Sequence, residues 1–494
     1  MSLSKSDYLL FLKHPAWMWL KKHDKRKLPE IDENTQAIFD AGHLFEKYAE
    51  QLFPGGVTLG FDTDNFDTYL SLPARTKKAL DEGASTIFQG RFESGNITCI
   101  CDVIVKVDDR TVDLYEIKSS TKAKLLHEHD LAFQLVVLER CGYTIRNIKV
   151  MHANNTYIRQ GDIDVHQLVV TEDMTDIVKE KREDTKDHIT QALAVMESLT
   201  IPNISPSHVK FQSMGEWLSI YKTLVSVPQG SIYNLCRLNE KLTEELEDRK
   251  ISMIADIPVD IKLHPRQKMQ VRATKENKVL IQGTDIKQFL SQFIFPLYFL
   301  DYETLANVVP EFDGFHPYQQ IPFQYSLHIM DTPGGDLQHV GYLHKEKSNP
   351  VPALSKSLAS HIGPVGTVIV WHESFEKGRN VEMGELLPEF HAFYRSMNER
   401  VLDLKTPFSE GWYIHKDFLG SASIKDVLPV LVSELSYAAL DIHEGTSAQR
   451  IWMETVLEGK NTSERVKVFQ DLDDYCTLDT LAMVRIYEKL VALF

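Results

Sequence analysis

The sequence predicts an α/β protein with two sheet-containing parts joined by a mostly helical segment. In the amino-terminal part, β-rich runs at 97–107 and 112–118 precede an amphipathic helical pattern and a further strand. In the carboxyl-terminal part, three strand patterns beginning at residue 297 precede an alternation of helices and strands. This order is typical of mixed sheets flanked by helices.

The first predicted domain covers residues 1–199. Its predicted elements are helices over 4–22 and 34–52, strands over 97–107 and 112–118, a helix over 124–140, a strand over 145–152 and a mixed-charge helix over 174–199. Pro202 and Pro206 then interrupt the pattern, which places a boundary near residue 200.

Residues 200–290 are predicted to be a mostly helical connection, and residues 291–494 a second sheet domain. A basic stretch at 262–278 is either a solvated surface or a path that follows phosphates. The predicted elements of the last domain are strands over 297–301, 323–330 and 337–344, a helix over 352–361, a strand over 367–371, a helix over 383–397, a strand over 401–404 and later helices that end with 475–491.

Bulk properties place the chain among globular proteins of several domains. Its 494 residues are enough for two or three domains, and 43% hydrophobic with 25% charged residues is a globular composition. The longest strongly apolar stretch, 289–300, is too short to cross a bilayer. The five cysteines are scattered and the amino terminus lacks a secretory pattern. We therefore expect a cytoplasmic protein without a membrane partner.

The net charge of −16 at first argues against nucleic acid as a partner. Its distribution is uneven, because residues 301–494 contain 16 basic and 28 acidic side chains. A region of sequence also has an excess of acidic residues when several carboxylates cluster to bind a metal ion. The acidity of this part therefore does not exclude phosphate substrates.

Two carboxylates follow an apolar run in this acidic part, where residues 297–304 read LYFLDYET. Because side chains alternate along a strand, Asp301 and Glu303 project from one face at a strand end. Such a pair suits a divalent metal, although acids in this pattern also cap helices or face water. The pair indicates a metal site more strongly if further acids are predicted to lie beside it.

Further acids follow at suitable positions. Residues 367–376 (TVIVWHESFE) predict a strand that runs into a helix, so that Glu376 lies beyond the carboxyl end of the strand. Asp403 ends the next strand and is interpreted as a strand-end or helix-cap carboxylate. Tyr475 and Asp479 are four residues apart and share one face of the last helix.

This order of residues resembles the DEDD exonucleases of the RNase H-like superfamily, in the branch with a tyrosine in the third motif. The second motif of that family reads roughly His-Asn-x-x-Phe-Asp, and here His372 stands at its Asn and Glu376 at its Asp. The resemblance implies an RNase H-like mixed sheet with a metal centre of two Mg²⁺ or Mn²⁺ ions. It implies as ligands Asp301, Glu303, Glu376 and Asp479, and as the group that orients the attacking water Tyr475.

A second acidic set surrounds the predicted strand at 112–118. Asp102 ends or interrupts the preceding strand, and Glu116 and Lys118 are two residues apart on one strand face. Two carboxylates and an amine in this arrangement predict a hydrolytic centre. Asp102 and Glu116 bind metal, while Lys118 orients water and steadies the developing charge.

The Asp-x13-Glu-x-Lys layout resembles the PD-(D/E)XK nucleases, with a restriction-endonuclease-like core, in their RecB-like branch. The resemblance implies that His43 on the helix at 34–52 is a metal ligand, with Mg²⁺ or Mn²⁺ as the metal. It also implies that Gln134 on the following helix positions substrate or water, whereas Leu138 replaces the tyrosine of the family. His14 occupies an early cysteine position of that branch, so we expect no iron–sulfur cluster.

Together, the two halves resemble a large family of bacterial two-nuclease proteins described mainly as a domain of unknown function. We therefore expect a metal-dependent nuclease with two centres that hydrolyses DNA or RNA exonucleolytically, at single strands or ends. Two alternatives remain open. One is a nucleic-acid-binding or scaffolding protein in which one or both centres have decayed, and the other is a phosphodiesterase for short oligonucleotides.

Overall fold

The computed structural model describes residues 2–211 and 214–494. The chain forms two compact units, both of them mixtures of helices and sheet. Unit 1 comprises Met1–Ser226 and Asn307–Tyr318, and unit 2 comprises Val227–Ala306 and Gln319–Phe494. The segment at 200–290 is thus divided between the units. No helix within the described ranges is long and apolar enough to cross a membrane.

Unit 1 is organised around a seven-stranded sheet in the order β2-β3-β4-β5-β6-β7, with β1 paired to β4. The strands are β1 (Leu3–Ser4), β2 (Val57–Thr58), β3 (Thr86–Ser94), β4 (Ile97–Lys106), β5 (Thr111–Lys118), β6 (Thr144–Ala153) and β7 (Val169–Asp173). Strands β3, β4 and β5 are antiparallel, whereas β6 runs parallel to β5. The crossover between β5 and β6 is made by helix α6 (Leu125–Arg140).

The other helices of unit 1 surround this sheet. They are α1 (Lys5–Lys13), α2 (Pro15–His23), α3 (Glu33–Glu50), α4 (Phe66–Leu70), α5 (Leu72–Asp81), α7 (Val165–Leu168), α8 (Thr175–Glu180), α9 (Arg182–Glu197) and α10 (Met214–Leu224).

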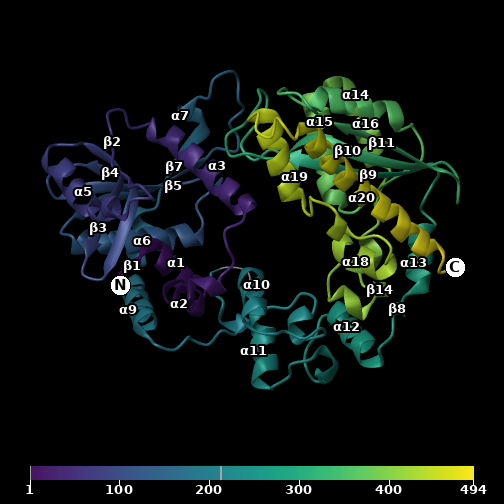
Figure 1. Cartoon of the computed structure of the whole chain (residues 1–494), viewed down its shortest axis with the longest axis horizontal. Helices are drawn as coiled ribbons and strands as arrows, with labels where there is room; N and C mark the ends of the chain where they lie inside the picture. The colour runs from purple at the N-terminus through teal and green to yellow at the C-terminus, as the bar shows by residue number, and fades with distance from the viewer. Residues whose placement is uncertain (1, 212–213) are drawn as a thin grey trace. The chain divides into compact units, whose positions relative to one another are not determined.

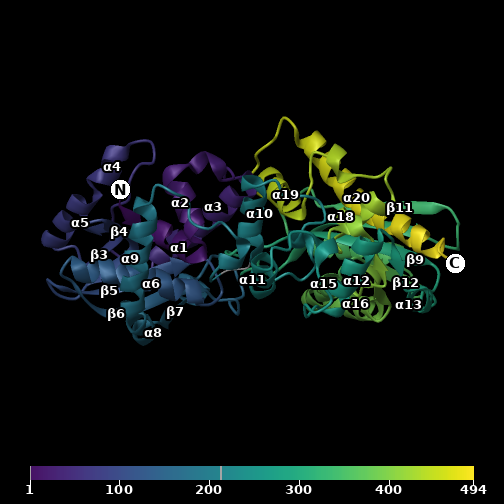
Figure 2. The ribbon, with the colours of Figure 1, turned by 90° about the horizontal axis from the view of Figure 1, so that it is seen from below.

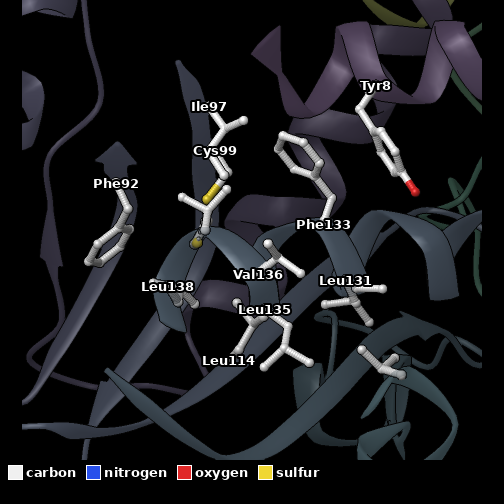
Figure 3. Packing of buried hydrophobic residues seen from close by; sticks show 14 of the residues in the cluster. Tyr8, Phe92, Ile97, Cys99, Leu114, Leu131, Phe133, Leu135, Val136 and Leu138 are labelled. Carbon is white, nitrogen blue, oxygen red and sulfur yellow. Dashed lines mark hydrogen bonds between the residues drawn. The ribbon is translucent and has the colours of Figure 1, made fainter. Parts of the chain in front are cut away.

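The main core of unit 1 lies between the sheet and helix α6. Figure 3 shows Phe133 and Leu135 of α6 beside Ile97 and Cys99 of β4, with Leu114 of β5 below them. Residues 129–138 of α6 are all buried, so this helix fills the core on every side instead of along one stripe. Each fully buried aliphatic or aromatic side chain of this kind contributes about 1.5 to 3 kcal/mol of hydrophobic stabilisation.

The opposite face of the sheet carries a second apolar cluster, which includes Phe45 of α3 and Val308 of the Asn307–Tyr318 segment. This segment is anchored within unit 1 by polar contacts as well. The Arg159 guanidinium donates to the carbonyls of Pro310 and Glu311 at 2.8 and 2.9 Å. Unit 1 is therefore completed by residues that lie between two strands of unit 2 in the sequence.

Unit 2 contains a five-stranded sheet in the order β11-β10-β9-β12-β13. The strands are β9 (Leu297–Leu305), β10 (Ile321–Met330), β11 (Leu337–Leu343), β12 (Thr367–Val370) and β13 (Val401–Asp403). Strands β9, β10 and β11 are antiparallel neighbours, and β12 and β13 continue the sheet in parallel with β9. A short separate pair joins β8 (Leu280–Ile281) and β14 (Tyr413–Ile414).

Helices cover both faces of the five-stranded sheet. The helices that follow β9 in this unit are α14 (Val351–His361), α15 (Glu373–Leu386), α16 (His391–Asn398), α17 (Thr406–Ser409), α18 (Ile424–Leu431), α19 (Gly445–Trp452) and α20 (Arg465–Val491), and the chain before the sheet forms α11 (Glu240–Asp248), α12 (Pro265–Glu276) and α13 (Gly283–Leu290). Helix α20 crosses β9 and β10 on one face, whereas α15 and α16 lie on the other (Figures 1 and 2).

Alternation along β9 decides which of its side chains meet which helix. Phe299 makes an edge contact with Tyr487 of α20, so the odd-numbered residues face that helix. The Tyr302 hydroxyl donates to Asn380 of α15 at 2.9 Å, so the even-numbered residues face the other layer. Asp301 therefore points toward α20.

Several elements differ from those expected. The predicted helix over 4–22 is two helices, because Pro15 lacks the N–H that a continuous helix requires. The helix expected over 383–397 is α15 followed by α16, with Pro388 at the break. The pattern over 174–199 is likewise divided into α8 and α9. Strand β3 was not expected, because Gly90 and Arg91 interrupt its apolar alternation.

The junction between α1 and α2 is fixed by a buried histidine. His14 is fully buried, and its ring stacks on Trp217 of α10 with 4.0 Å between ring centroids. Its Nδ1 accepts from the Ala16 N–H at 3.1 Å, and its Nε2 is 3.1 Å from the Ser205 carbonyl. Burial lowers the pKa of His14 to about 4.

We predict that His14 makes the stability of unit 1 fall in acid. A histidine in the unfolded chain takes up a proton near pH 6.5, whereas His14 in the folded unit does so only near pH 4. Its stabilisation is complete above pH 6.5 and is lost as the pH falls toward 4, by about 2 to 3 kcal/mol. Urea unfolding of wild type and His14→Gln between pH 7 and 4, followed by tryptophan fluorescence, measures this difference.

The exposed His166 of α7 offers the matched control, because His166→Gln should keep the acid sensitivity of wild type. A gap between wild type and His14→Gln that stays constant over this pH range would contradict the prediction.

Candidate functional site

The predicted acids of unit 1 lie on neighbouring antiparallel strands. Val103 of β4 pairs with Tyr115 of β5, so the next positions in register are Asp102 and Glu116. The two backbones part there, and the Asp102 Oδ2 accepts from the Ile117 N–H at 2.8 Å. Asp102 thus replaces a ladder hydrogen bond with a side-chain hydrogen bond, and this holds its carboxylate beside Glu116.

The distortion of β4 at Asp102 is matched by an unusual backbone conformation on the neighbouring strand β3. Cys101 belongs to the same apolar cluster as Ile104, whereas Val103 belongs to the cluster of the opposite face, so alternation shifts by one residue at Asp102. Across the sheet, Gln89 has a φ of 56°, a conformation that non-glycine residues seldom adopt. Distortions of this kind redirect a side chain and are frequent next to active sites.

Helix α6 adds two polar side chains to this centre. Asp130 and Gln134 are one helical turn apart, and both are buried. The Gln134 Nε2 donates to the Glu116 Oε2 at 2.6 Å and to the Asp130 Oδ1 at 2.9 Å. Gln134 therefore fixes the Glu116 carboxylate and has a buried Oε1 without a partner among the described residues.

Two lysines neutralise much of the negative charge of this centre. The Lys118 ammonium is 2.6 Å from the Glu116 Oε1 and 2.8 Å from the Asp130 Oδ2. The Lys5 ammonium is 2.8 Å from the same oxygen of Glu116. Burial alone would raise the pKa of Glu116, but the two ammonium groups outweigh it and lower this pKa well below its usual range. Glu116 is consequently a carboxylate at any physiological pH.

Lys5 reaches this centre because the start of the chain is tied to the sheet. Leu3 pairs with Ile97 of β4, and helix α1 begins two residues later. Ser4 and Asp7 form a capping box in which each side chain accepts from the backbone N–H of the other residue. Strand pairing and the cap together set the direction in which Lys5 points.

Asp102 and helix α3 complete the surroundings. Burial and the charge of Glu116 raise the pKa of Asp102 to about 7. On α3, His43 is exposed, and Glu46 one turn later is half-buried. Burial raises the pKa of Glu46, His43 opposes the rise, and the charge of Glu116 adds to it. Helix α3 therefore presents Glu46 toward the centre and His43 at its rim.

In unit 2, strand β9 places two acids against helix α20. Oxygens of Asp301 and Glu303 and the Cys476 sulfur lie within 4.8 Å of one another. Glu303 and Cys476 are buried, and Asp301 is partly buried. A cation held by these three groups would have two hard oxygen ligands and one sulfur.

Helix α20 also contributes Tyr475 and Asp479, both buried. The Tyr437 hydroxyl donates to the Asp479 Oδ1 at 2.6 Å, which holds that carboxylate on the side of the acids of β9. Burial and the nearby Asp479 and Glu303 raise the pKa of Tyr475 well above its usual range. Tyr475 is therefore a neutral phenol, and its hydroxyl accepts a hydrogen bond from the Lys425 ammonium.

Lys425 brings a positive charge to the acids of unit 2. It lies in the first turn of α18, and its ammonium donates to the His443 carbonyl at 2.6 Å and to the Tyr475 hydroxyl at 3.2 Å. It lies over the rings of both Tyr437 and Tyr475, at 5.6 and 5.3 Å from their centroids. Contacts of this type hold an ammonium group in a partly buried place.

Glu376 lies in the first turn of α15, beyond the end of β12. Asp403 accepts from the Glu373 N–H at 3.2 Å and from the Lys405 N–H at 2.9 Å, so it caps the helix that carries Glu376. Glu376 is buried, and its Oε2 has no hydrogen-bond partner among the described residues. An ionised carboxylate in this state is costly unless a cation or a proton joins it.

The acids of unit 2 raise one another's affinity for protons. Burial and the charges of Asp479, Glu303 and Glu376 raise the pKa of Asp301 well above its usual range. Burial also raises the pKa of Glu303 to about 8 and that of Glu376 to about 8. Burial raises the pKa of Asp479 to about 6, although Tyr437 and Lys425 act in the opposite direction. Lys425 acts on Asp301, Glu303 and Asp479, whereas Arg379 and Lys405 act on Glu376. Four buried or partly buried carboxylates of this kind fit a divalent cation by charge and by ligand type.

The structure therefore gathers most of the predicted site residues into two centres. In unit 1 it brings together Asp102, Glu116, Lys118 and Gln134, with His43 at the rim. In unit 2 it brings together Asp301, Glu303, Tyr475 and Asp479, with Glu376 within electrostatic reach. The sequence interpretation did not include Lys5, Glu46, Asp130, Lys425, Tyr437 and Cys476. Of these, Lys425 gave a signal, because it ends the conspicuous segment GSASIK at 420–425.

Comparison with known proteins gives two matches. Residues 298–423 match the family described as "Domain of unknown function (DUF2779)", and this stretch contains Asp301, Glu303 and Glu376. The chain is 26% identical over 208 residues to "Uncharacterized protein MG366" of Mycoplasma genitalium. That similarity covers 38% of this chain and 31% of the relative, so the chain spans about a third of the length of the curated relative it matches. One region of the chain thus resembles a family without an assigned function.

We predict that replacing one acid in the centre of unit 2 by its amide stabilises the protein in metal-free buffer. Burial and the charges of Asp479, Glu303 and Glu376 disfavour ionisation of Asp301 in the folded protein, whereas the unfolded chain ionises this group freely, and Asp301→Asn removes that difference. We expect the free energy of unfolding to rise by about 1 to 2 kcal/mol, since relief of strain at functional sites commonly gains this much. Thermal and urea unfolding in the presence of a chelator measure the change.

Asp474 of the same helix is exposed and accepts from Gln470 one turn earlier, so Asp474→Asn serves as the control and should change stability by less than about 0.5 kcal/mol. The prediction is wrong if Asp301→Asn lowers the unfolding temperature of the metal-free protein.

Proposed function

We propose that this protein is a cytoplasmic, metal-dependent nuclease with one hydrolytic centre in each unit. The observation that carries the proposal is that each sheet holds its own group of buried carboxylates at the positions singled out from the sequence. Buried acids in such numbers cost stability, and sites that bear this cost are frequently functional.

The strand order of unit 2 supports an RNase H-like fold for it. Three antiparallel strands followed by two parallel ones place β9 at the centre of the sheet. The acids of β9, the start of α15 and one face of α20 then converge on the same region. This agrees with the resemblance to exonucleases that have a tyrosine in their third motif.

The arrangement in unit 1 supports a PD-(D/E)XK-like fold. The antiparallel strands β3, β4 and β5, the crossover helix α6 and the parallel strand β6 form its central part. Asp102, Glu116 and Lys118 lie on the adjoining strands β4 and β5, and Gln134 holds the middle member of that set. The Lys118 ammonium is able to stabilise negative charge that develops on a phosphate during hydrolysis.

Mg²⁺ or Mn²⁺ would be held in unit 2 by Asp301, Glu303, Asp479 and Glu376, and in unit 1 by Asp102 and Glu116 with His43 or Glu46. Such ions activate water and stabilise a leaving oxygen when bound. Side chains of the protein supply the other groups of the centre. Tyr475 offers a neutral hydroxyl that positions a water molecule, and Lys425 fixes that hydroxyl and offsets part of the negative charge.

A strand-binding protein without hydrolysis is the rival proposal, and one observation favours it. The Lys5 ammonium is bound to Glu116, which reduces the charge that unit 1 can offer to a metal. Cleavage measurements separate the two proposals, because a binder without active centres retains nucleic acid and leaves it intact.

The test is cleavage of end-labelled single- and double-stranded DNA and RNA with Mg²⁺ or Mn²⁺. Glu116→Gln and Asp301→Asn should each remove one class of products, with a fall in rate of about a hundredfold or more at the affected centre. The double variant should lose both classes. Equal background cleavage by wild type and the double variant would sink the proposal.

Glu180→Gln on α8 and Asp474→Asn on α20 are matched controls, since both side chains are exposed and outside the centres. Each should cleave at the wild-type rate. Thermal unfolding of all variants shows whether a lost activity reflects the centre or a lost fold.

A further inference from the structure

A basic groove lies in unit 2 beside the acidic centre. It is open to solvent and has a volume of about 520 Å³. It is lined partly by Arg237 and Arg266 of the chain before the sheet, and partly by Lys405, Trp371 and His372 at the ends of β13 and β12. We call this feature the basic groove. Its volume is within the range of about 300 to 1,000 Å³ that is usual for ligand sites.

The charge of the basic groove is opposite to that of its surroundings. Three of its lining side chains are cationic, and its lining residues, all within the described ranges, include no carboxylate. The part of the chain that forms the sheet of unit 2 is strongly acidic, with 28 acidic against 16 basic residues over 301–494. A concentration of positive charge at one place in such a unit creates a local site for anions.

The walls of the basic groove are held in place by hydrogen bonds. The Arg266 guanidinium donates through one nitrogen to the carbonyls of Gly420 and Ser421, both at 3.2 Å. The Trp371 indole N–H donates to the Ala422 carbonyl at 3.2 Å. Arg237 has a φ of 53° and its guanidinium is 2.9 Å from the His264 Nε2. A groove with ordered walls loses little entropy when it binds a ligand.

The basic groove lies near the centre of unit 2, because Lys405, which lines the groove, is close enough to Glu376 to act on it electrostatically. His372 lines it, and Glu376 follows four residues later in α15. Ile424 also lines it, and the next residue, Lys425, contacts Tyr475. Residues that line the basic groove are thus close in sequence to residues of the acidic centre. A chain-like anion with its end at the centre would therefore extend into the groove.

We propose that the basic groove binds the phosphodiester backbone of a single nucleic-acid strand whose end lies at the centre of unit 2. This inference rests on the proposed nuclease function and names the substrate class of that centre. Arginine forks and a lysine recognise phosphate oxygens. Trp371 also lines the groove, with its ring packed on Phe408, and single strands commonly bind in positively charged grooves with aromatic side chains.

The test measures binding of labelled single-stranded DNA and, separately, RNA of about 20 nucleotides to the full chain. The Glu116→Gln/Asp301→Asn protein serves as the parent so that the strands stay intact. Adding Arg237→Gln and Lys405→Gln should weaken binding roughly fivefold to tenfold at about 0.1 M salt. The slope of log affinity against log salt should become shallower by about 1.4, since each phosphate contact on a single strand contributes about 0.7. Comparison of the two strands shows which sugar is preferred.

Arg272 of α12 is exposed, outside the groove and paired with Glu276, so Arg272→Gln in the same parent is the matched control. It should keep the affinity and the salt slope. Arg237→Lys preserves the charge and should remain within about twofold of the parent, which guards against misfolding as the cause of a loss.

The two proposals fail in different ways. If wild type cleaves no strand, the nuclease function fails whatever the binding experiment gives. If wild type cleaves strands but the Arg237→Gln/Lys405→Gln variant binds them with the affinity and salt slope of its parent, the nuclease function stands and the basic groove is not the strand site.

Discussion

Both units are governed by the cost of burying carboxylates inside a sheet. An ionised group in a protein interior needs a counter-charge and hydrogen bonds, or it takes up a proton instead. The two units meet this requirement differently. In unit 1, Lys5 and Lys118 hold Glu116 ionised, and Gln134 bonds to the same carboxylate. In unit 2, Lys425 faces a larger group of acids, and the pKa of Glu303 rises with burial and with the charge of Asp479.

Contacts from the surrounding helices and strands hold these acids in position. Asp403 caps α15 and so sets where Glu376 lies, and Tyr437 fixes Asp479 from outside the sheet. In unit 1, pairing of Leu3 with β4 directs Lys5 toward Glu116. The common effect of these contacts is to hold polar groups in place where repulsion would otherwise separate them.

The sequence predicts those parts of each centre that follow from local periodicity. Alternation along a strand places Asp301 and Glu303 on one face, and the helical repeat does the same for Tyr475 and Asp479. The general α/β character follows equally well from the order of strands and helices. Proline interrupted the predicted helices at Pro15 and Pro388, where the apolar pattern continued across a backbone break.

The remaining residues could not be predicted because their neighbours are distant in the chain. Lys5 is 111 residues from Glu116, and Lys425 is 50 residues from Tyr475. Their positions depend on the strand pairing of β1 and on the packing of α18. The segment GSASIK draws attention to Lys425, but no local pattern shows which residue it contacts. Cys476 was interpreted only as one of several scattered cysteines, although its neighbour Tyr475 marked the helix face beside it.

Unit 2 has an acidic centre and, near it, the basic groove. This arrangement of charge affects which ligands the unit can bind. An acidic centre without metal repels a phosphate, whereas the basic groove attracts one. A strand could therefore be retained by Arg237 and Lys405 while its end enters the acidic centre together with divalent cations. The net charge of the chain hides this arrangement, because the acids outnumber the groove cations. The placement of charge, and not its sum, decides whether a polyanion is a suitable partner.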